Sequence, residues 1–386
     1  MSDSKYKIVY CTPALYSAGG VERIVSVKAN YFADVLGYDV TVIVTEGKGR
    51  ASFFPLSDKV KVVNFELGFE ELWRASFFRK VLLYLQKQRQ FKKLLTAELM
   101  RIRPDFTISM LRREINFLTD IRDGSKKIGE LHVNRANYRN FEQNESNALK
   151  KLFAKLWMDS LVSKLTKLDR LVVLTEKSKA SWPELSNVEV IPDPLPFQVE
   201  VKSDLHAKRI ISIGRYAYQK GYDILLESWR LVEKTHPDWS LHIYGSHDGG
   251  VGDYKRLQEH IDDYKIGNVF LHQSTNDIYS CYAESDFYVM SSRFESFGLV
   301  LIEAMSCGLP VISFDCKYGP KSIIQKGETG MLVPQGDIKE MAKAICLMIE
   351  NDEGRQRMAV NARQESKKYH PQNIMPIWHE FYESLV

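Results

Sequence analysis

The stretch KIVYCTPALYSAGGVERIVSVKANYFADVLGYDVTVIVTE, residues 7–46, contains a full strand–helix–strand pattern. Residues 7–14 and 39–46 are short apolar runs rich in β-branched side chains, which is typical of buried strands. The segment between them has apolar residues at helical spacing and ends at Gly37, a residue type that commonly stops a helix. A strand, a glycine loop, a helix and a strand in this order predict a βαβ unit, and hence a parallel α/β sheet.

The same alternation continues along the chain and is interrupted once. Further strands of the first series are predicted at residues 60–67, 105–111, 126–132 and 169–175. Pro192, Pro194 and Pro196 then exclude a helix interior or a central strand, so the domain linker is expected within residues 188–197. A second alternating series follows, with strands predicted at 209–214, 239–246, 268–274, 286–292, 309–315 and 330–334. The pattern predicts two doubly wound lobes that bind ligands in a cleft, at the carboxyl ends of their strands.

The composition is that of an ordinary globular protein. The 386 residues are 44% hydrophobic and 26% charged, which excludes a disordered chain, a collagen-like repeat and a coiled-coil rod. The five cysteines are scattered and form no C-x-x-C pair, so neither a zinc ribbon nor a redox motif is expected. The N-terminal residues lack the pattern of a signal peptide, and no run approaches the ~18 apolar residues of a membrane-spanning helix. We therefore expect a cytoplasmic protein.

Positive charge is concentrated in the first half of the chain. Residues 1–195 carry 32 Lys and Arg against 23 Asp and Glu, whereas residues 196–386 carry 21 against 26. Much of the surplus lies in two predicted helical stretches, 74–103 and 148–170, which mix basic and apolar residues. Three interpretations stay open, of which the favoured one is an amphipathic helix that packs its apolar face on the core. The others are docking on an anionic membrane surface and binding of nucleic acid, and no aromatic–basic RNA motif supports the last.

Two predicted strand ends carry residues suited to phosphate. Gly19 and Gly20 follow the first strand and open a helix, where unpaired backbone N–H groups attract anions. Their spacing does not fit G-x-G-x-x-G, so a dinucleotide site is disfavoured, and a purely structural tight turn stays open. In IGRYAYQKGYD, Arg215 and Lys220 follow a predicted strand, and such a pair suits a diphosphate. Two ordinary surface cations are the alternative.

Two carboxylates stand eight residues apart in SSRFESFGLVLIEAMSCG. Glu295 lies in a loop between a predicted strand and a predicted helix, and Glu303 lies within that helix among apolar and small residues. A buried carboxylate requires hydrogen-bond donors, which the hydroxyls of a sugar can supply. The backbone around Gly298 presents N–H groups at the start of the same helix. The combination predicts a site for sugar hydroxyls and phosphate.

These motifs together resemble the retaining glycosyltransferases of family four. The matching segments are IGRYAYQKGYDILLES, YAESDFYVMSSRFESFGLVLIEAMSCGLPVIS and DCKYGPKSIIQKGETGMLVPQGD, and SAGGVER resembles the family's first glycine loop. The resemblance is strong over residues 209–345 and thinner over residues 47–170. It implies the GT-B fold, with two Rossmann-like lobes and a cleft between them. Residues 1–192 would bind the acceptor, residues 193–370 the nucleotide sugar, and residues 371–386 would form a helix that crosses back to the first lobe.

The resemblance implies a catalytic role for four residues. Arg215 and Lys220 would neutralise the donor diphosphate and stabilise the departing nucleotide. Glu295 would bind hydroxyls of the donor sugar. His132, at the end of the predicted strand KKIGELH, matches a histidine that faces that sugar, whereas a lone histidine would otherwise be interpreted as structural.

The resemblance implies a second set of residues that bind the donor without reacting. Glu303 would hold the ribose hydroxyls, and the others would contact sugar or phosphate through their backbone or line the adjacent loops. The set comprises Gly19, Gly20, Phe297, Gly298, Leu299, Glu303, Gly319 and Pro320. Tyr216 and Tyr218 depart from the family's small residues in this region, and could narrow the site or stack on a ligand.

The implied activity is a metal-independent hexosyl transfer with retention at the anomeric carbon. No D-x-D motif is suitably placed, so no metal and no cofactor are expected. The donor is expected to be a UDP-sugar, and the acceptor a glycan or a lipid-linked glycan in cell-surface polysaccharide synthesis. Location in the cytoplasm or at the inner face of the membrane is expected. A nucleotide-sugar epimerase of the same fold and a non-catalytic sugar-nucleotide binding protein remain the alternatives.

Overall fold

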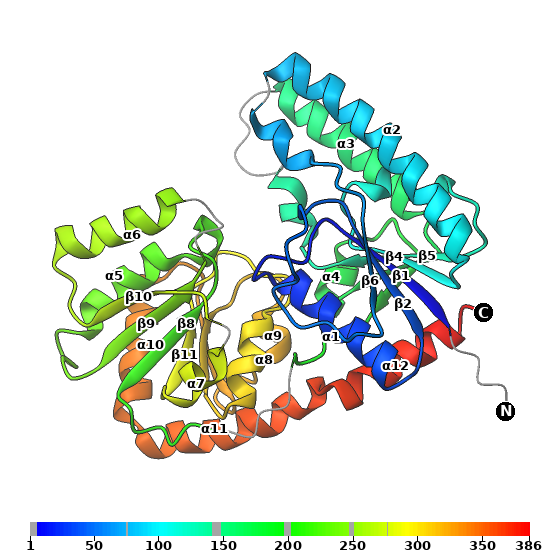
Figure 1. The fold of residues 1–386 in the computed structure, drawn as a ribbon. Helices are drawn as coiled ribbons and strands as arrows, with labels where there is room; N and C mark the ends of the chain where they lie inside the picture. Colours follow the sequence, from blue (N-terminus) through cyan, green and yellow to red (C-terminus); the bar gives the residue numbers. More distant parts are fainter. Residues whose placement is uncertain (1–5, 75, 141–147, 197–201, 247–250, 276) are drawn as a thin grey trace. The chain divides into compact units, whose positions relative to one another are not determined.

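The structure is a computed structural model that describes residues 6–74, 76–140, 148–196, 202–246, 251–275 and 277–386. The chain folds into two compact units. Unit 1 comprises residues 1–194 and 375–386, and unit 2 comprises residues 195–374. Each contains one parallel sheet with helices, and the two units are described separately below (Figure 1).

Unit 1 is built on a seven-stranded parallel sheet in the order β3-β2-β1-β4-β5-β6-β7. The register pairs Ile8 of β1 with Val40 of β2 and with Phe106 of β4, so the buried β-branched run from which the sheet was predicted lies at its centre. The strands are β1 (Lys7–Thr12), β2 (Asp39–Val44), β3 (Lys61–Asn64), β4 (Phe106–Ser109), β5 (Lys126–Leu131), β6 (Arg170–Val173) and β7 (Val188–Val190).

The helices of unit 1 bury one face each. Their longest members are α1 (Gly20–Asp34), α2 (Phe77–Ile102) and α3 (Ala148–Leu165), and α4 (Glu176–Ala180) is short. The second half of α2 packs Phe91, Leu95 and Leu99 into the core. The last helix, α12 (Pro371–Glu383), contributes the buried side chains of Trp378 and Tyr382.

Unit 2 is built on a six-stranded parallel sheet in the order β10-β9-β8-β11-β12-β13. Its strands are β8 (Arg209–Ile213), β9 (Ser240–Gly245), β10 (Val269–Gln273), β11 (Phe287–Met290), β12 (Val311–Phe314) and β13 (Gly330–Val333). Its helices are α5 (Tyr222–Val232), α6 (Val251–Tyr264), α7 (Ile278–Ala283), α8 (Leu299–Ser306), α9 (Pro320–Ile323), α10 (Ile338–Glu350) and α11 (Asp352–Ser366).

The order of β8, β11 and β12 decides where the loops of unit 2 meet. These three strands are neighbours and parallel, although they are far apart in sequence. The loops that leave their carboxyl ends therefore lie at one edge of the sheet, where open α/β sheets bind ligands. Lys220, Glu295 and Gly319 all follow these strands.

The predicted α/β architecture is confirmed, and every strand expected from the sequence is present with shortened ends. Among the described residues, β7, α11 and the short helices α4 and α9 were not predicted. The edge strand β7 lies just before Pro192, within the segment assigned to the linker. An edge strand needs ladder hydrogen bonds on one side only, so a proline can follow it at once. Helix α11 was missed because it is predominantly polar.

Candidate active site

In unit 2, a lysine and a glutamate predicted to bind donor groups are paired with each other. The Nζ atom of Lys220 lies 2.7 Å from Oε1 of Glu295. The same oxygen accepts a hydrogen bond of 2.8 Å from the hydroxyl of Ser292. The two side chains are 16% and 11% exposed, so the pair is partly open to solvent. Ser292, just after β11, was not singled out by the sequence.

Glu303, by contrast, is almost fully buried within α8. Its Oε2 accepts a hydrogen bond of 3.1 Å from the hydroxyl of Tyr282 in α7. Helix α8 begins beside Gly298, whose φ of +102° lies in the region that favours glycine. Leu299 is the first helical residue, so its backbone N–H has no acceptor within the helix, whereas the N–H of Leu301 donates to the carbonyl oxygen of Gly298 at 2.8 Å.

The loop before α9 touches the backbone that precedes α8. A Cβ atom added to Gly319 would lie 2.1 Å from the carbonyl oxygen of Phe297, closer than any real contact. Only glycine therefore permits this approach. Pro320 follows at the first position of α9, where its missing N–H costs nothing. The structure thus places Gly319, with Pro320 next to it in the chain, against the backbone of Phe297.

The aromatic residues near the Arg215–Lys220 loop have separate roles. Tyr216 is fully buried, and its hydroxyl donates to the carbonyl oxygens of Ile243 and His272. The expectation that Tyr216 narrows the site or stacks on a ligand is therefore wrong, because its ring fills the core. Tyr218 is exposed and lies under the guanidinium of Arg293. Arg215 itself is exposed beside the end of β8.

In unit 1, the glycine loop is followed directly by helix α1. Gly19 caps the helix in an extended conformation, and Gly20 is its first residue. Nothing lies within 4 Å of a Cβ added to Gly20, so no packing requires a glycine there. A steric need for glycine therefore does not explain this residue, which removes one reason for interpreting the glycine pair as a purely structural turn.

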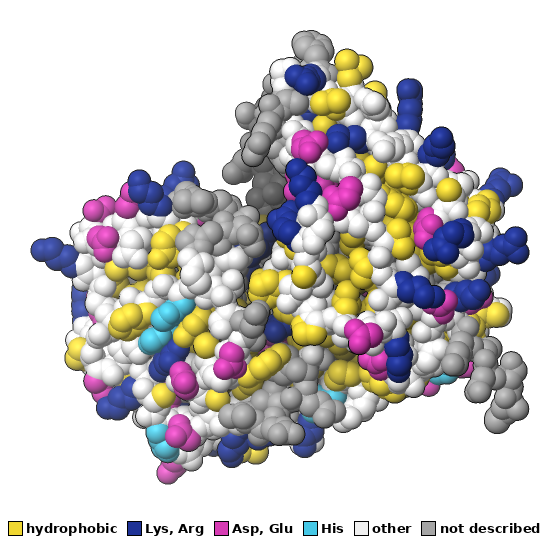
Figure 2. Space-filling model, in the orientation of Figure 1, with side chains coloured by type: hydrophobic (Ala, Val, Ile, Leu, Met, Phe, Trp, Pro, Cys, Tyr) yellow, Lys and Arg dark blue, Asp and Glu magenta, His cyan; other side chains and the backbone are white. Residues whose placement is uncertain are grey.

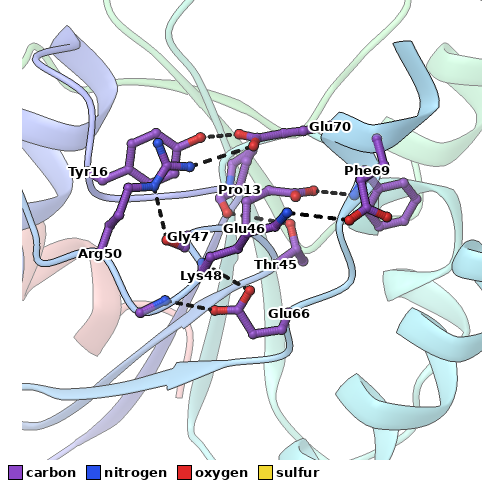
Figure 3. A network of polar contacts seen from close by, with 12 residues as sticks. Pro13, Tyr16, Thr45, Glu46, Gly47, Lys48, Arg50, Glu66, Phe69 and Glu70 are labelled. Carbon is purple, nitrogen blue, oxygen red and sulfur yellow. Dashed lines mark hydrogen bonds and ion pairs between the residues drawn. The ribbon is translucent and has the colours of Figure 1, made fainter. Parts of the chain in front are cut away.

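A polar network holds the strand-end loops around this glycine loop (Figure 3). The guanidinium of Arg50 lies 3.3 Å from the ring centre of Tyr16 and forms an ion pair of 3.6 Å with the carboxylate of Glu70. The same carboxylate accepts a hydrogen bond from the hydroxyl of Tyr16. Oε1 of Glu46 accepts a 2.9 Å hydrogen bond from the backbone N–H of Phe69. Burial raises the pKa of Glu46, although Arg113 acts in the opposite direction. The loops that follow β1, β2 and β3 are thereby joined at the carboxyl edge of the sheet.

His132 lies one residue after β5, where the sequence placed it, and both of its ring nitrogens face carboxylates. Nδ1 is 3.2 Å from Oδ2 of Asp193, and Nε2 is 3.3 Å from Oε2 of Glu130. Burial alone would lower the pKa of His132, but Asp193 and Glu130 raise it to about 9. The ring is therefore a cation at neutral pH, and it cannot serve as a general base there.

The sequence analysis missed the two partners of this histidine, Glu130 and Asp193, and the lysine that pairs with Glu130. Glu130 lies within a strand, Asp193 lies between two prolines, and Lys28 lies on the buried face of α1. A signal was present for Lys28, because Ile24 and Phe32 stand four residues to either side on that face.

The described part of the chain contains no group of three or more His, Cys, Asp or Glu side chains arranged to hold a metal ion. Among the described residues, no helix is both long and apolar enough to cross a bilayer.

Comparison with known proteins agrees with this geometry. Residues 197–365 match the family of glycosyl transferases group 1. Nearly the whole chain is also similar to an uncharacterized glycosyltransferase of Haemophilus influenzae, at 29% identity over 96% of this chain and 98% of that one. A poly(ribitol-phosphate) α-N-acetylglucosaminyltransferase of Staphylococcus aureus is 29% identical over 67% of this chain, which spans only 51% of that relative.

The solved structures establish the fold. A mutant of TarM from S. aureus, in complex with fondaparinux, α-GlcNAc-glycerol and UDP, superposes with a TM-score of 0.79. The match covers 98% of this chain and 99% of TarM, at 17% identity. The fold is therefore GT-B, as the resemblance implied.

Proposed function

We propose that the protein is a retaining glycosyltransferase of family four that moves a sugar from a UDP-sugar to an acceptor hydroxyl during cell-surface glycan synthesis. The observation that carries this proposal is the hydrogen-bonded group of Lys220, Ser292 and Glu295 in the loops that leave the carboxyl ends of β8 and β11, beside the neighbouring strand β12. UDP is present in the TarM structure, and the S. aureus relative acts on poly(ribitol-phosphate). Both facts support the choice of donor and acceptor.

The residues of unit 2 would divide the donor between them. Arg215 and Lys220 would meet the diphosphate, with Lys220 exchanging its contact with Glu295 for one with phosphate. Glu295 would then accept hydrogen bonds from sugar hydroxyls, and Glu303 from those of the ribose. The backbone N–H of Leu299, at the start of α8, would face the same anion. Preorganised charges of this kind commonly supply the largest part of a rate enhancement.

The chemical step would break the bond between the anomeric carbon and the diphosphate oxygen, whose electron pair leaves with UDP. The acceptor oxygen would form the new bond on the same face of the sugar, and its proton would pass to the departing phosphate oxygen. His132 carries a proton at neutral pH, and both of its N–H groups face carboxylates, so it would act on the sugar through its positive charge. Arg215 and Lys220 would do the work of a divalent ion, without a metal.

The first experiment measures UDP release from a panel of UDP-sugars, with and without poly(ribitol-phosphate), poly(glycerol-phosphate) and lipid-linked glycans. Release that depends on an added acceptor supports transfer. Conversion of the nucleotide sugar without any acceptor would favour the epimerase alternative, and binding without turnover would favour the non-catalytic one. The anomeric configuration of the product, determined by NMR, tests retention.

The location of the protein is a separate proposal that rests on the first half of α2. Val81, Leu82 and Leu85 are exposed there, beside basic side chains, whereas the second half of the helix packs on the core. Figure 2 shows dark blue basic and yellow apolar side chains intermixed over this region. We propose that this face docks on the anionic inner surface of the cytoplasmic membrane, where apolar insertion and charge attraction add.

Vesicle co-sedimentation tests the docking. Binding to vesicles containing phosphatidylglycerol is expected at low salt, and weaker binding at high salt. The double variant Leu82→Glu/Leu85→Glu should lose binding. The control variant Val360→Glu changes an exposed apolar residue on a different helix, α11, and should still bind the vesicles. Absence of wild-type binding at low salt would remove the proposal and leave the sugar transfer untouched.

A further inference from the structure

A cluster of buried ionisable groups surrounds His132 and lies wholly within unit 1. Its members come from β1, from α1, from the end of β5, from the segment that follows β7, and from α12. The side chain of His132 is 8% exposed, and the other members are at least nine-tenths removed from solvent. We call it the Lys28 cluster, and it comprises Tyr10, Lys28, Glu130, His132, Asp193, Trp378 and Tyr382.

Lys28 is the most buried charge of this cluster, with an exposed fraction of 0%. Its Nζ atom lies 2.6 Å from Oε1 of Glu130 and 3.2 Å from the ring centre of Trp378. Burial lowers the pKa of Lys28, and Glu130 acts in the opposite direction. A lysine so placed keeps its charge through the carboxylate on one side and the aromatic face on the other.

Glu130 is fixed by partners on both of its oxygens. Oε1 accepts from Lys28, and Oε2 faces Nε2 of His132 at 3.3 Å. Burial would raise the pKa of Glu130, but Lys28 and His132 outweigh it and lower that pKa. The carboxylate is thus ionised and cannot rotate without giving up one partner.

The ring of His132 is fixed in the same way, since Asp193 holds its other nitrogen. A half-turn of the ring would part both nitrogens from their acceptors. The two residues after Asp193 lead into unit 2, so this carboxylate ties the histidine to the end of the unit 1 segment. The remaining ionisable groups that pack here are the hydroxyls of Tyr10 and Tyr382, whose pKa values burial raises well above their usual range.

We propose that Lys28 and Glu130 are positioning residues for the reaction, which hold the ring of His132 protonated and in one orientation. The inference rests on the proposed function, in which His132 contacts the donor sugar. A buried ion pair is weak support for stability, because two apolar residues of equal volume commonly serve as well or better. A pair that only stabilised the fold would not need the second oxygen of Glu130 to reach a histidine.

The test separates the charge on His132 from the stability of the fold. Glu130→Gln removes the carboxylate but leaves Lys28 buried without a counter-charge, so this variant is expected to unfold easily. The double variant Lys28→Met/Glu130→Gln leaves no unpaired charge and similar volumes, and it is expected to fold. Lys61→Met, which breaks the exposed pair of Lys61 and Asp39, is the matched control.

The first readout is the NMR titration of His132, in protein labelled at histidine Cε1 and assigned by comparison with His132→Gln. In the double variant the midpoint should fall by one pH unit or more, and in the control it should stay near that of the wild type. An unchanged midpoint in the double variant would overturn the inference, whether or not the protein transfers sugar.

The second readout is the pH profile of kcat/KM. Wild-type activity should decline at alkaline pH as His132 loses its proton, and in the double variant this decline should begin at correspondingly lower pH. At pH 8 the double variant should then retain about half of its own maximal activity or less, whereas the wild type should retain about nine-tenths of its maximum. A folded double variant with the wild-type profile would show that the pair is structural only, and would overturn the positioning role.

Discussion

The protein contains two lysine–glutamate pairs of nearly equal length and opposite accessibility. Lys28 and Glu130 lie 2.6 Å apart in unit 1, with exposed fractions of 0% and 2%. Lys220 and Glu295 lie 2.7 Å apart in unit 2, with exposed fractions of 16% and 11%. Water and ligands can compete for the second pair and cannot reach the first. The same two residue types thus form a buried pair in one unit, for which we propose a positioning role, and a partly exposed pair in the other, for which we propose an exchange of partners with the donor.

The largest expected effect comes from breaking the buried pair. Lys28→Ala would remove the closer of the two cations that face the buried carboxylate of Glu130, and this should lower the free energy of unfolding of unit 1 by about 3 kcal/mol. Lys220→Ala, the corresponding change in the other pair, should lower that of unit 2 by about 1 kcal/mol or less. Urea unfolding followed by tryptophan fluorescence measures both. Equal losses would show that accessibility does not distinguish the pairs.

Lys220→Ala, which should affect stability little, should affect catalysis strongly. Lys220→Ala should reduce kcat/KM by about 30- to 1,000-fold, which corresponds to about 2–4 kcal/mol of lost transition-state stabilisation. Lys255→Ala changes an exposed lysine on α6 and should leave kcat/KM unchanged. Steady-state kinetics with the donor found in the UDP-sugar panel provide the measurement. Full activity of the Lys220 variant would contradict the proposed role of the pair.

The charge on His132 predicts a pH dependence of stability. Because its pKa rises from 6.5 in the unfolded chain to about 9 in the folded one, its contribution is complete below pH 6.5 and is lost as pH rises through 9. The contribution below pH 6.5 is about 3 kcal/mol. His132→Gln and the wild type should therefore differ most near pH 6 and converge by pH 10 in chemical denaturation. A constant difference across this range would mean that the ring is neutral in the fold.

The smallest expected effect on stability is at Gly20. Gly20→Ala places a methyl group in open space at the first turn of α1 and should change the unfolding free energy by about 1 kcal/mol or less. Activity should nevertheless fall if the backbone there approaches the donor. Gly319→Ala is the contrasting variant, because its methyl group would meet the Phe297 carbonyl, and stability should fall with activity. Calorimetry and UDP release on both variants separate the two glycines.

The sequence predicted the structure best where a single local pattern of residues is enough to define an element. The parallel strands follow from apolar runs between turn residues, and the edge of unit 2 follows from residues that come just after strands. The Lys28 cluster could not be predicted in this way, because its members are spread from Tyr10 to Tyr382 and meet only through tertiary packing. The Lys220–Glu295 pair was missed for a related reason, since each residue was assigned its own ligand before the fold showed that they bind each other.

The contact between Lys28 and Trp378 also sets an order of events during synthesis. Lys28 leaves the ribosome before Trp378, because it precedes Trp378 in the chain, and the two side chains are in contact only in the folded unit 1. Unit 2 lies between them in sequence and can fold as soon as it emerges. Unit 1 therefore cannot be completed before unit 2 has been synthesised, and a nascent chain stalled before Trp378 would carry a complete unit 2 and a unit 1 that still lacks the buried side chains of Trp378 and Tyr382.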